Sequence, residues 1–144
     1  MAKQQSAQRE ELQMDHQVWV EKANENLASA QLCFEQGHFN ACSNRLYYAM
    51  FHAGLAALAK AGLSSMNKKI SHDWLQANFS RQLIQQRKIF TAKFRSYLSD
   101  AQSIRDITDY KRFSVSQDSA SRELKKAKEF VNMINQEVFH DAQS

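Results

Sequence analysis

The sequence predicts an all-α protein, folded as an up-and-down bundle of four main helices plus one short helix. Its 144 residues include no proline and only three glycines, whereas strand-rich folds need both residues in their many turns. Hydrophobic residues make up 43% of the chain and charged residues 24%, which suits a single core. Apolar residues also recur at helical spacing. We therefore expect one helical domain over residues 15–140, preceded by a flexible tail of residues 1–14.

The first half of the chain predicts two long helices that are separated by glycine. Apolar residues recur every three or four positions over residues 19–34, which places them on one face of a helix that begins at Asp15. This helix should end near Gly37, because glycine adopts the left-handed conformation that closes helices. A second helix is expected over residues 39–61. Gly54 lies inside it and should allow another helix to approach closely.

The second half predicts a short helix followed by two longer ones. Ser71 is the expected cap of the short helix, whose apolar positions span residues 74–83. The next helix has its apolar face over residues 89–104. The stretch 109–114 lacks a helical stripe, and the last helix then presents one apolar face over residues 120–138. Short connections between such helices favour antiparallel neighbours.

Composition also predicts where the protein works. No run approaches the roughly 18 apolar residues that cross a bilayer, and the polar N-terminal residues lack the apolar stretch of a signal peptide. Two cysteines cannot form the disulfide framework of a small secreted protein. We expect a cytoplasmic protein with no membrane partner.

Basic residues are concentrated in the middle of the chain. The window of residues 60–95 contains eight lysines or arginines and one acidic residue, although the net charge of the whole chain is only +4. This asymmetry favours a polyanionic partner such as RNA or a nucleotide. Lysines and arginines that merely solvate exposed helix faces would give the same pattern. The residues expected to bind such a partner are Lys68, Lys69, Arg87 and Lys88.

One face of the second predicted helix carries an unusual set of functional groups. Arg45, Tyr48 and His52 are spaced i, i+3 and i+7, which places them on the same side of a helix. Together an arginine, a phenol and an imidazole can hold a phosphate, position a ribose hydroxyl and exchange a proton near neutral pH. The alternative is structural, with Arg45 paired to an acid on a neighbouring helix and the two rings packed at the edge of the core.

A second polar cluster lies near the end of the fourth predicted helix. Arg105 and Asp109 are four residues apart, as are Asp106 and Tyr110, so the spacing predicts one ion pair and one hydrogen bond. The functional alternative is that Arg105 and the polar groups beside it face a groove, where the guanidinium fork grips a phosphodiester.

Other motifs carry less chemistry. The Glu-x-x-His patterns at residues 35–38 and 137–140 have the spacing of bundle metal sites, but a glycine interrupts the first and the second lies near the end of the last helix. We therefore expect neither a metal nor a cofactor. His72 stands beside Asp73 at a predicted helix start, where a cap or surface pair is expected rather than a catalytic dyad.

The two polar clusters resemble signatures of the HEPN (higher eukaryotes and prokaryotes nucleotide-binding) domains, especially their small stand-alone prokaryotic branch. Residues 45–51 are similar to the signature Arg-x-Tyr-Tyr-Ala-x-Phe, and residues 105–110 follow the later signature Arg-x-x-x-Asp-Tyr. The match covers about residues 15–139. The resemblance implies a helical bundle that forms a homodimer with a cleft at the interface. It also implies a partner protein with a minimal nucleotidyltransferase fold.

The resemblance implies two functions, which the sequence leaves open. Many family members are metal-independent endoribonucleases, often toxins or phage-defence effectors, that use an arginine followed four to six residues later by histidine. Here Tyr110 stands where that histidine would follow Arg105, whereas Arg45 and His52 satisfy the spacing on an earlier helix. In related toxins the nucleotidyltransferase partner modifies a tyrosine close to the catalytic histidine, which makes Tyr110 a target by analogy.

The first hypothesis is therefore an endoribonuclease toxin or defence effector. Its expected catalytic residues are Arg45, His52, Arg105, Asp109 and Tyr110. Tyr48 and Asp106 are expected to assist binding beside them. The second hypothesis is a non-catalytic module that binds RNA, a nucleotide or a partner protein through the same cleft.

Overall fold

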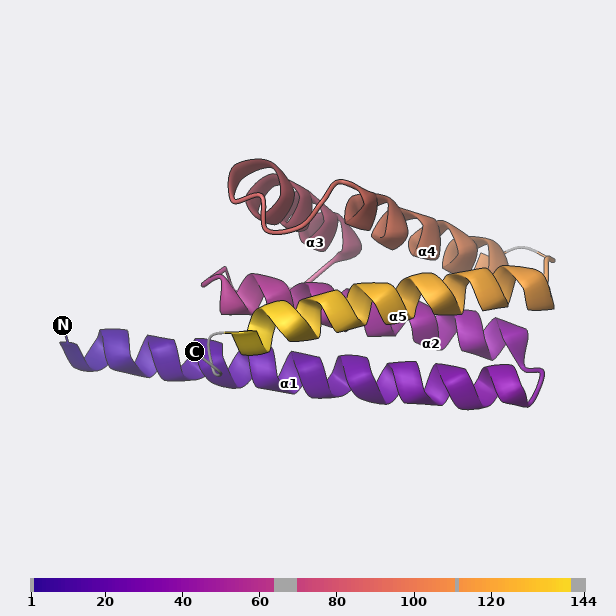
Figure 1. The fold of residues 1–144 in the computed structure, drawn as a ribbon, viewed down its shortest axis with the longest axis horizontal. Coiled ribbons are helices and arrows are strands. Elements are labelled where there is room, and N and C mark those ends of the chain that lie inside the picture. Colours follow the sequence, from indigo (N-terminus) through magenta and orange to yellow (C-terminus); the bar gives the residue numbers. More distant parts are fainter. Residues whose placement is uncertain (1, 64–69, 111, 141–144) are drawn as a thin grey trace.

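The chain folds as a bundle of helices in the computed structural model (Figure 1), which describes residues 2–63, 70–110 and 112–140, with side chains from residue 16 to residue 138. These ranges contain no strand, so the predicted all-α class is confirmed. None of the helices described is long and apolar enough to cross a membrane. In chain order the elements are α1 (Ala2–Glu35), α2 (Phe39–Lys60), α3 (His72–Asn78), the π-helix η1 (Phe79–Gln86), α4 (Lys93–Tyr110) and α5 (Gln117–His140).

Helix α2 lies at the centre of the bundle and contacts α1, α3, η1, α4 and α5. In Figure 1, α1, α2 and α5 lie side by side along the long axis, while α3, η1 and α4 form a layer above them. Ala53–Ala59 are all buried, because this part of α2 is covered on every side. A Cβ atom on Gly54 would come within 3.1 Å of Leu75 Cδ1, which confirms that this glycine allows α3 to approach closely.

The predicted helix ends are formed by the expected residues. Gly37 and Gly62 have positive φ angles of 76° and 82°, a conformation that glycine adopts without steric cost. The hydroxyl of Ser71 accepts a hydrogen bond from the backbone N–H of Trp74 at 3.1 Å, as the cap of α3. The first turn of α3 is therefore held in place by the residue that precedes it.

Helix α1 begins well before its predicted start. The sequence predicts a first residue at Asp15, whereas the helix begins at Ala2. The preceding segment has no apolar stripe, but it is rich in glutamine and also contains alanine and glutamate, which have high helix propensity. The predicted start was wrong because it rested on the apolar periodicity, which begins later than the helix does. A division into a tail of residues 1–14 and a domain of residues 15–140 stays a prediction.

The chain between α3 and α4 also differs from the expected pattern. The short helix continues as the π-helix η1, and α4 begins at Lys93 rather than near Ile89. Lys88 has a positive φ of 53°, which interrupts the helical path before the apolar residues that follow it. Phe90 nevertheless reaches the core, where it stacks on Phe79 with ring centroids 5.4 Å apart. The apolar spacing thus predicted correctly that Phe90 is a core residue, but it placed Phe90 wrongly inside a helix.

Candidate functional site

The predicted polar face of α2 is formed as the spacing requires. Cζ of Arg45 lies 5.4 Å from the centroid of the Tyr48 ring, and the ring centroids of Tyr48 and His52 are 6.0 Å apart. All three side chains are half-buried. Two turns of helix therefore bring a guanidinium, a phenol and an imidazole into one row.

Asn26 of α1 connects the two ends of this row. Its Oδ1 accepts a hydrogen bond from Arg45 Nη1 at 3.1 Å, and its Nδ2 lies 3.2 Å from Nδ1 of His52. Arg45 also donates to Oδ1 of Asn44 at 2.8 Å, so amides bind this guanidinium and not the acid expected from the sequence. Because the Asn26 oxygen faces Arg45, its NH2 group donates to His52. The ring proton of neutral His52 is consequently on Nε2.

His52 is uncharged at neutral pH. Its ring stacks on Trp19, with centroids 5.3 Å apart and an angle of 19° between the planes. Burial, followed by the positive charges of Lys22 and Arg45, lowers the pKa of His52 to about 4. At pH 7 this side chain offers one N–H donor and holds no positive charge.

Helix α4 brings Arg105 to the same tyrosine. Cζ of Arg105 lies 4.9 Å from the centroid of Tyr47 and 5.2 Å from that of Tyr48, so guanidinium groups from two separate signatures contact the Tyr48 ring. The guanidinium is mostly buried, because 19% of the Arg105 side chain is exposed. Its Nε forms no hydrogen bond with any described residue, although Oδ2 of Asp109 lies 3.4 Å away.

The later signature is only partly arranged as expected. The ion pair between Arg105 and Asp109 is confirmed. Helix α4 extends through Tyr110, which lies in the stretch predicted to be non-helical. The Tyr110 side chain is 80% exposed and, among the described residues, forms no hydrogen bond with Asp106, so that part of the prediction was wrong. Tyr110 thus lies outside the group of residues around Tyr48.

His72 is the residue that the sequence interpretation missed. Its Nε2 lies 3.0 Å from the hydroxyl of Tyr47 and 3.1 Å from Nη1 of Arg105. The expectation of a cap or surface pair was wrong, because Ser71 supplies the cap and the His72 ring packs against Tyr47 with centroids 4.9 Å apart. Since an arginine N–H can only donate, Nε2 of His72 accepts and the ring proton of the neutral form is on Nδ1.

The pKa of His72 is lowered from its ordinary value. Burial is the largest cause and the positive charge of Arg105 the next, while Asp106 and Asp73 act in the opposite direction. His72 is therefore neutral at pH 7, with a lone pair on the nitrogen that faces Arg105. The predicted cap at Ser71 could have indicated that His72 has a fixed position at the start of a helix. The contact between His72 and α4 depends on the tertiary fold, so no local pattern indicates it.

These side chains form one cluster, which we call the two-arginine site. It combines two guanidinium groups, two phenols and two neutral imidazoles of opposite tautomer. Such a set can bind a phosphate by charge-assisted hydrogen bonds, accept one proton and donate hydrogen bonds to a leaving oxygen. The members of the two-arginine site are Arg45, Tyr47, Tyr48, His52, His72 and Arg105.

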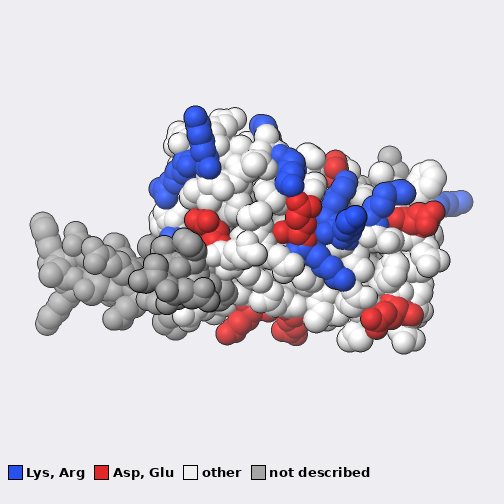
Figure 2. Space-filling model, in the orientation of Figure 1, with Lys and Arg blue, Asp and Glu red and all other residues white. Residues whose placement is uncertain are grey.

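The predicted basic residues do not join this site through any described contact. Nη1 of Arg87 donates to the carbonyl oxygen of Ala61 at 3.1 Å, and Lys88 is exposed. Lys68 and Lys69 lie outside the described residues. On the face shown in Figure 2, basic side chains occur over the end of the bundle where η1 meets α4 and, mixed with acidic ones, over α5. The basic surface is thus spread over several elements.

No group of three or more His, Cys, Asp or Glu side chains within the described ranges could hold a metal ion. The family model of the HEPN domain matches residues 16–137 of the chain, which include both arginine signatures and His72. Among curated proteins, none is similar enough to count as a relative.

Proposed function

The chain belongs to the HEPN domain family, and on this premise we propose that the two-arginine site binds an RNA phosphodiester and cleaves it without a metal ion. The biological role would be that of a toxin or defence effector. One observation carries the proposal: Arg45 and Arg105, which are 60 positions apart in sequence, both contact one tyrosine ring, with two neutral histidines beside them.

The chemistry of the site supports specific roles. Arg45 and Arg105 would bind the scissile phosphate and stabilise the negative charge that develops on its oxygens. Nε2 of His72 has the lone pair needed to take the proton of the ribose 2′-hydroxyl. Nε2 of His52 has the N–H needed to donate a hydrogen bond to the leaving 5′-oxygen. These assignments give the role of base to His72, although the sequence favours His52 and Tyr110 as catalytic residues.

The proposed reaction is a transesterification. The 2′-oxygen forms a bond to phosphorus as its proton passes to His72, and the bond between phosphorus and the 5′-oxygen breaks as that oxygen, held by a hydrogen bond from His52, receives a proton from water. The products are a 2′,3′-cyclic phosphate and a free 5′-hydroxyl. The hydroxide that remains then removes the proton from His72 and re-forms water, so no other reactant is consumed.

The test is an RNA cleavage assay in the presence of a chelator. We expect wild-type protein to cleave end-labelled RNA in EDTA and to leave 2′,3′-cyclic phosphate ends. Arg45→Ala and Arg105→Ala should each lose about 10²-fold or more in rate, because each removes a charge that stabilises the transition state. Arg112→Ala is the matched control, since this exposed arginine lies outside both the site and the basic window of residues 60–95. Cleavage that survives both substitutions would contradict the proposal.

A second function is favoured by a different observation. The lone pair of His52 is bound by Asn26, and that of His72 by Arg105 and Tyr47, so both acceptor nitrogens are occupied. A non-catalytic module would use these arginines to bind RNA, a nucleotide or a partner protein. It would bind RNA with Arg105-dependent affinity yet leave the RNA intact under every condition tested.

The partner proteins of the proposal are a second copy of the chain and a nucleotidyltransferase-fold protein. Tyr110 has the exposure that enzymatic modification requires, with 80% of its side chain accessible. Co-expression with a protein of nucleotidyltransferase fold should add a nucleotidyl mass to the peptide that contains Tyr110. Tyr97, which donates a hydrogen bond to Glu129 at 2.9 Å, should remain unmodified and serves as the internal control.

A further inference from the structure

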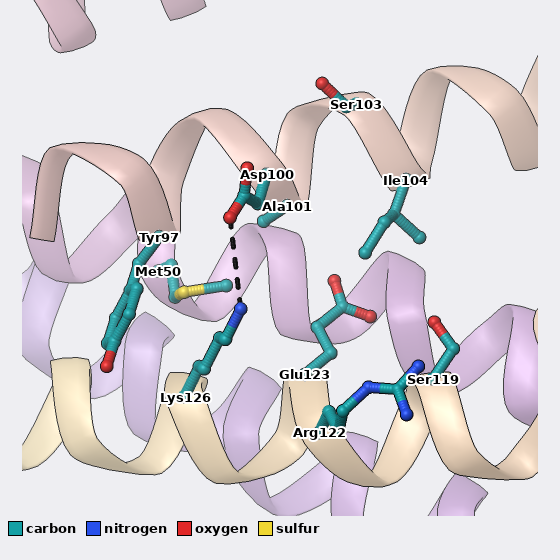
Figure 3. A pocket seen from close by; sticks show the side chains of 10 residues that line it. All are labelled: Met50, Tyr97, Asp100, Ala101, Ser103, Ile104, Ser119, Arg122, Glu123 and Lys126. Atoms are coloured by element: carbon teal, nitrogen blue, oxygen red, sulfur yellow. Dashed lines mark ion pairs between the residues drawn. The ribbon is translucent and has the colours of Figure 1, made fainter. Parts of the chain in front are cut away.

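A pocket separate from the two-arginine site lies between α4 and α5 (Figure 3). Its volume is about 300 Å³, and Met50 of α2 contributes to its apolar wall with Ala101 and Ile104 of α4. None of its lining residues belongs to the two-arginine site. A concave site with an apolar wall and a few polar groups is the usual form of a small-molecule site.

Glu123 places a carboxylate in this pocket. In Figure 3 the side chain extends from α5 towards α4, into the space between the helices. Only 5% of the residue is exposed. Oε1 accepts a hydrogen bond from Ser43 at 2.5 Å, whereas Oε2 is buried without a hydrogen-bond partner among the described residues. A buried acceptor without a partner is costly, so Oε2 marks the position of a missing donor.

Two cationic side chains line the same pocket. Lys126 forms an ion pair with Asp100, with Nζ 3.9 Å from Oδ2, and both side chains are substantially exposed (Figure 3). Arg122 is exposed and has no ion-pair or hydrogen-bond partner in the described part of the chain. The pocket therefore has the buried carboxyl of Glu123 and, from exposed side chains, the Lys126–Asp100 ion pair and the guanidinium of Arg122, which is unpaired among the described residues.

We propose that this pocket binds a small zwitterion, whose ammonium or guanidinium group donates to Glu123 and whose carboxylate lies against Arg122 and Lys126. A simple cation would leave Arg122 without a counter-charge, and a simple anion would leave Glu123 without a donor. A ligand that carries one group of each charge can pair with Glu123 through its cation and with Arg122 and Lys126 through its anion. The volume suits a molecule of amino-acid size.

Calorimetric titration with L-arginine, L-lysine and agmatine tests this site. The first two carry a carboxylate and distinguish a guanidinium from an ammonium head, while agmatine has the guanidinium but lacks the carboxylate. We expect at least one of the amino acids to bind once per chain, and agmatine to bind at least tenfold more weakly than arginine. Binding should release a fraction of a proton at pH 7, because burial raises the pKa of free Glu123 to about 7 and a bound cation lowers it.

Three variants complete the test. Glu123→Gln keeps an acceptor for the Ser43 hydroxyl and should bind the preferred amino acid at least tenfold more weakly, without proton release. Arg122→Gln should weaken binding of the amino acids but not of agmatine. Glu137→Gln, an exposed position on the same helix, should bind as wild type does. Failure of all three probes to bind at millimolar concentration, or equal binding by Glu123→Gln, would overturn the proposal.

Discussion

Nε2 of His72 lies 3.1 Å from Nη1 of Arg105, which joins the first residue of α3 to the later part of α4. The same nitrogen lies 3.0 Å from the hydroxyl of Tyr47 on α2. Three elements thus meet at one imidazole. Because the lowered pKa keeps this ring neutral, it can accept a proton from a substrate that displaces one of its two present donors.

Substitution of His72 should impair cleavage without preventing RNA binding. We expect His72→Ala to lower the cleavage rate by about 10²-fold, as for a lost general base, and to change RNA affinity less than Arg105→Ala does. A base works only when unprotonated, and burial lowers the pKa of His72 below its ordinary value of 6.5. The acid limb of kcat/KM should therefore lie below pH 6.5. Full activity in His72→Ala would remove the residue from the mechanism.

His52 and Tyr110 provide the comparison between the two signatures. His52→Ala should lower the rate by a similar factor, because it removes the hydrogen bond that stabilises the leaving oxygen. Tyr110→Phe should cleave RNA at the wild-type rate, since the exposed hydroxyl lies outside the two-arginine site. Rates measured under single-turnover conditions separate these effects from product release. The reverse result, with His52→Ala active and Tyr110→Phe impaired, would move proton transfer to the later signature.

RNA binding should depend steeply on salt. Each phosphate neutralised on a single strand releases counterions and contributes about −0.7 to the slope of log K against log salt. Substitution of Lys68, Lys69, Arg87 and Lys88 by glutamate should weaken binding and make this slope less steep by about that amount for each phosphate that is no longer neutralised. Fluorescence anisotropy over a salt series measures both quantities. If affinity and slope stay unchanged, the basic residues only solvate the surface.

Much of the fold was predictable because its signals are local. The stripe over residues 19–34, the glycines that end helices and the Ser71 cap each depend on a few neighbouring residues. The left-handed Lys88 was not predictable, because lysine carries no preference for that conformation. The π-helical path of η1 had no sequence signal either. The predictions of helix type and helix boundaries were therefore wrong where neither composition nor periodicity indicates the backbone conformation.

The candidate site was likewise predictable only in part. The row from Arg45 to His52 follows from spacing within one helix, and the structure arranges it so. Asn26 and His72 join the row from other elements, and a single sequence gives no sign of such contacts. Glu123 resembled any acidic residue of an amphipathic helix, yet it is buried beside Ser43. Which polar residues belong to a site therefore depends on contacts between elements that are distant in sequence.

The protein should form a homodimer in solution. Ile107 and Phe113 are 41% and 66% exposed, and they lie close in sequence to the exposed Tyr110. Exposed large apolar residues that gather in one region are typical of interfaces. We expect a dimer at micromolar concentration by sedimentation velocity, and a shift to monomer on substitution of Ile107 by glutamate. Met133→Glu is the matched control, because Met133 is 40% exposed on α5. A monomeric wild type would mean that no cleft is shared between two copies of the chain.

Replacement of Glu123 should change how stability depends on pH. Burial raises the pKa of this carboxyl from 4.5 to about 7, against the opposing effects of the Ser43 hydrogen bond and Lys126. The folded state thus holds the proton more tightly than the unfolded state. This contribution to stability is complete below pH 4.5 and is lost as the pH rises through about 7.

The free energy of unfolding of the wild type should therefore fall by roughly 3 kcal/mol relative to Glu123→Gln between pH 4.5 and pH 8. Urea unfolding at several pH values measures the difference, and subtraction of the two curves cancels the groups common to both proteins. Glu137→Gln, on the exposed side of α5, should run parallel to wild type. Parallel curves for wild type and Glu123→Gln would mean that the carboxyl ionises normally, and hence that Oε2 has found a donor such as water.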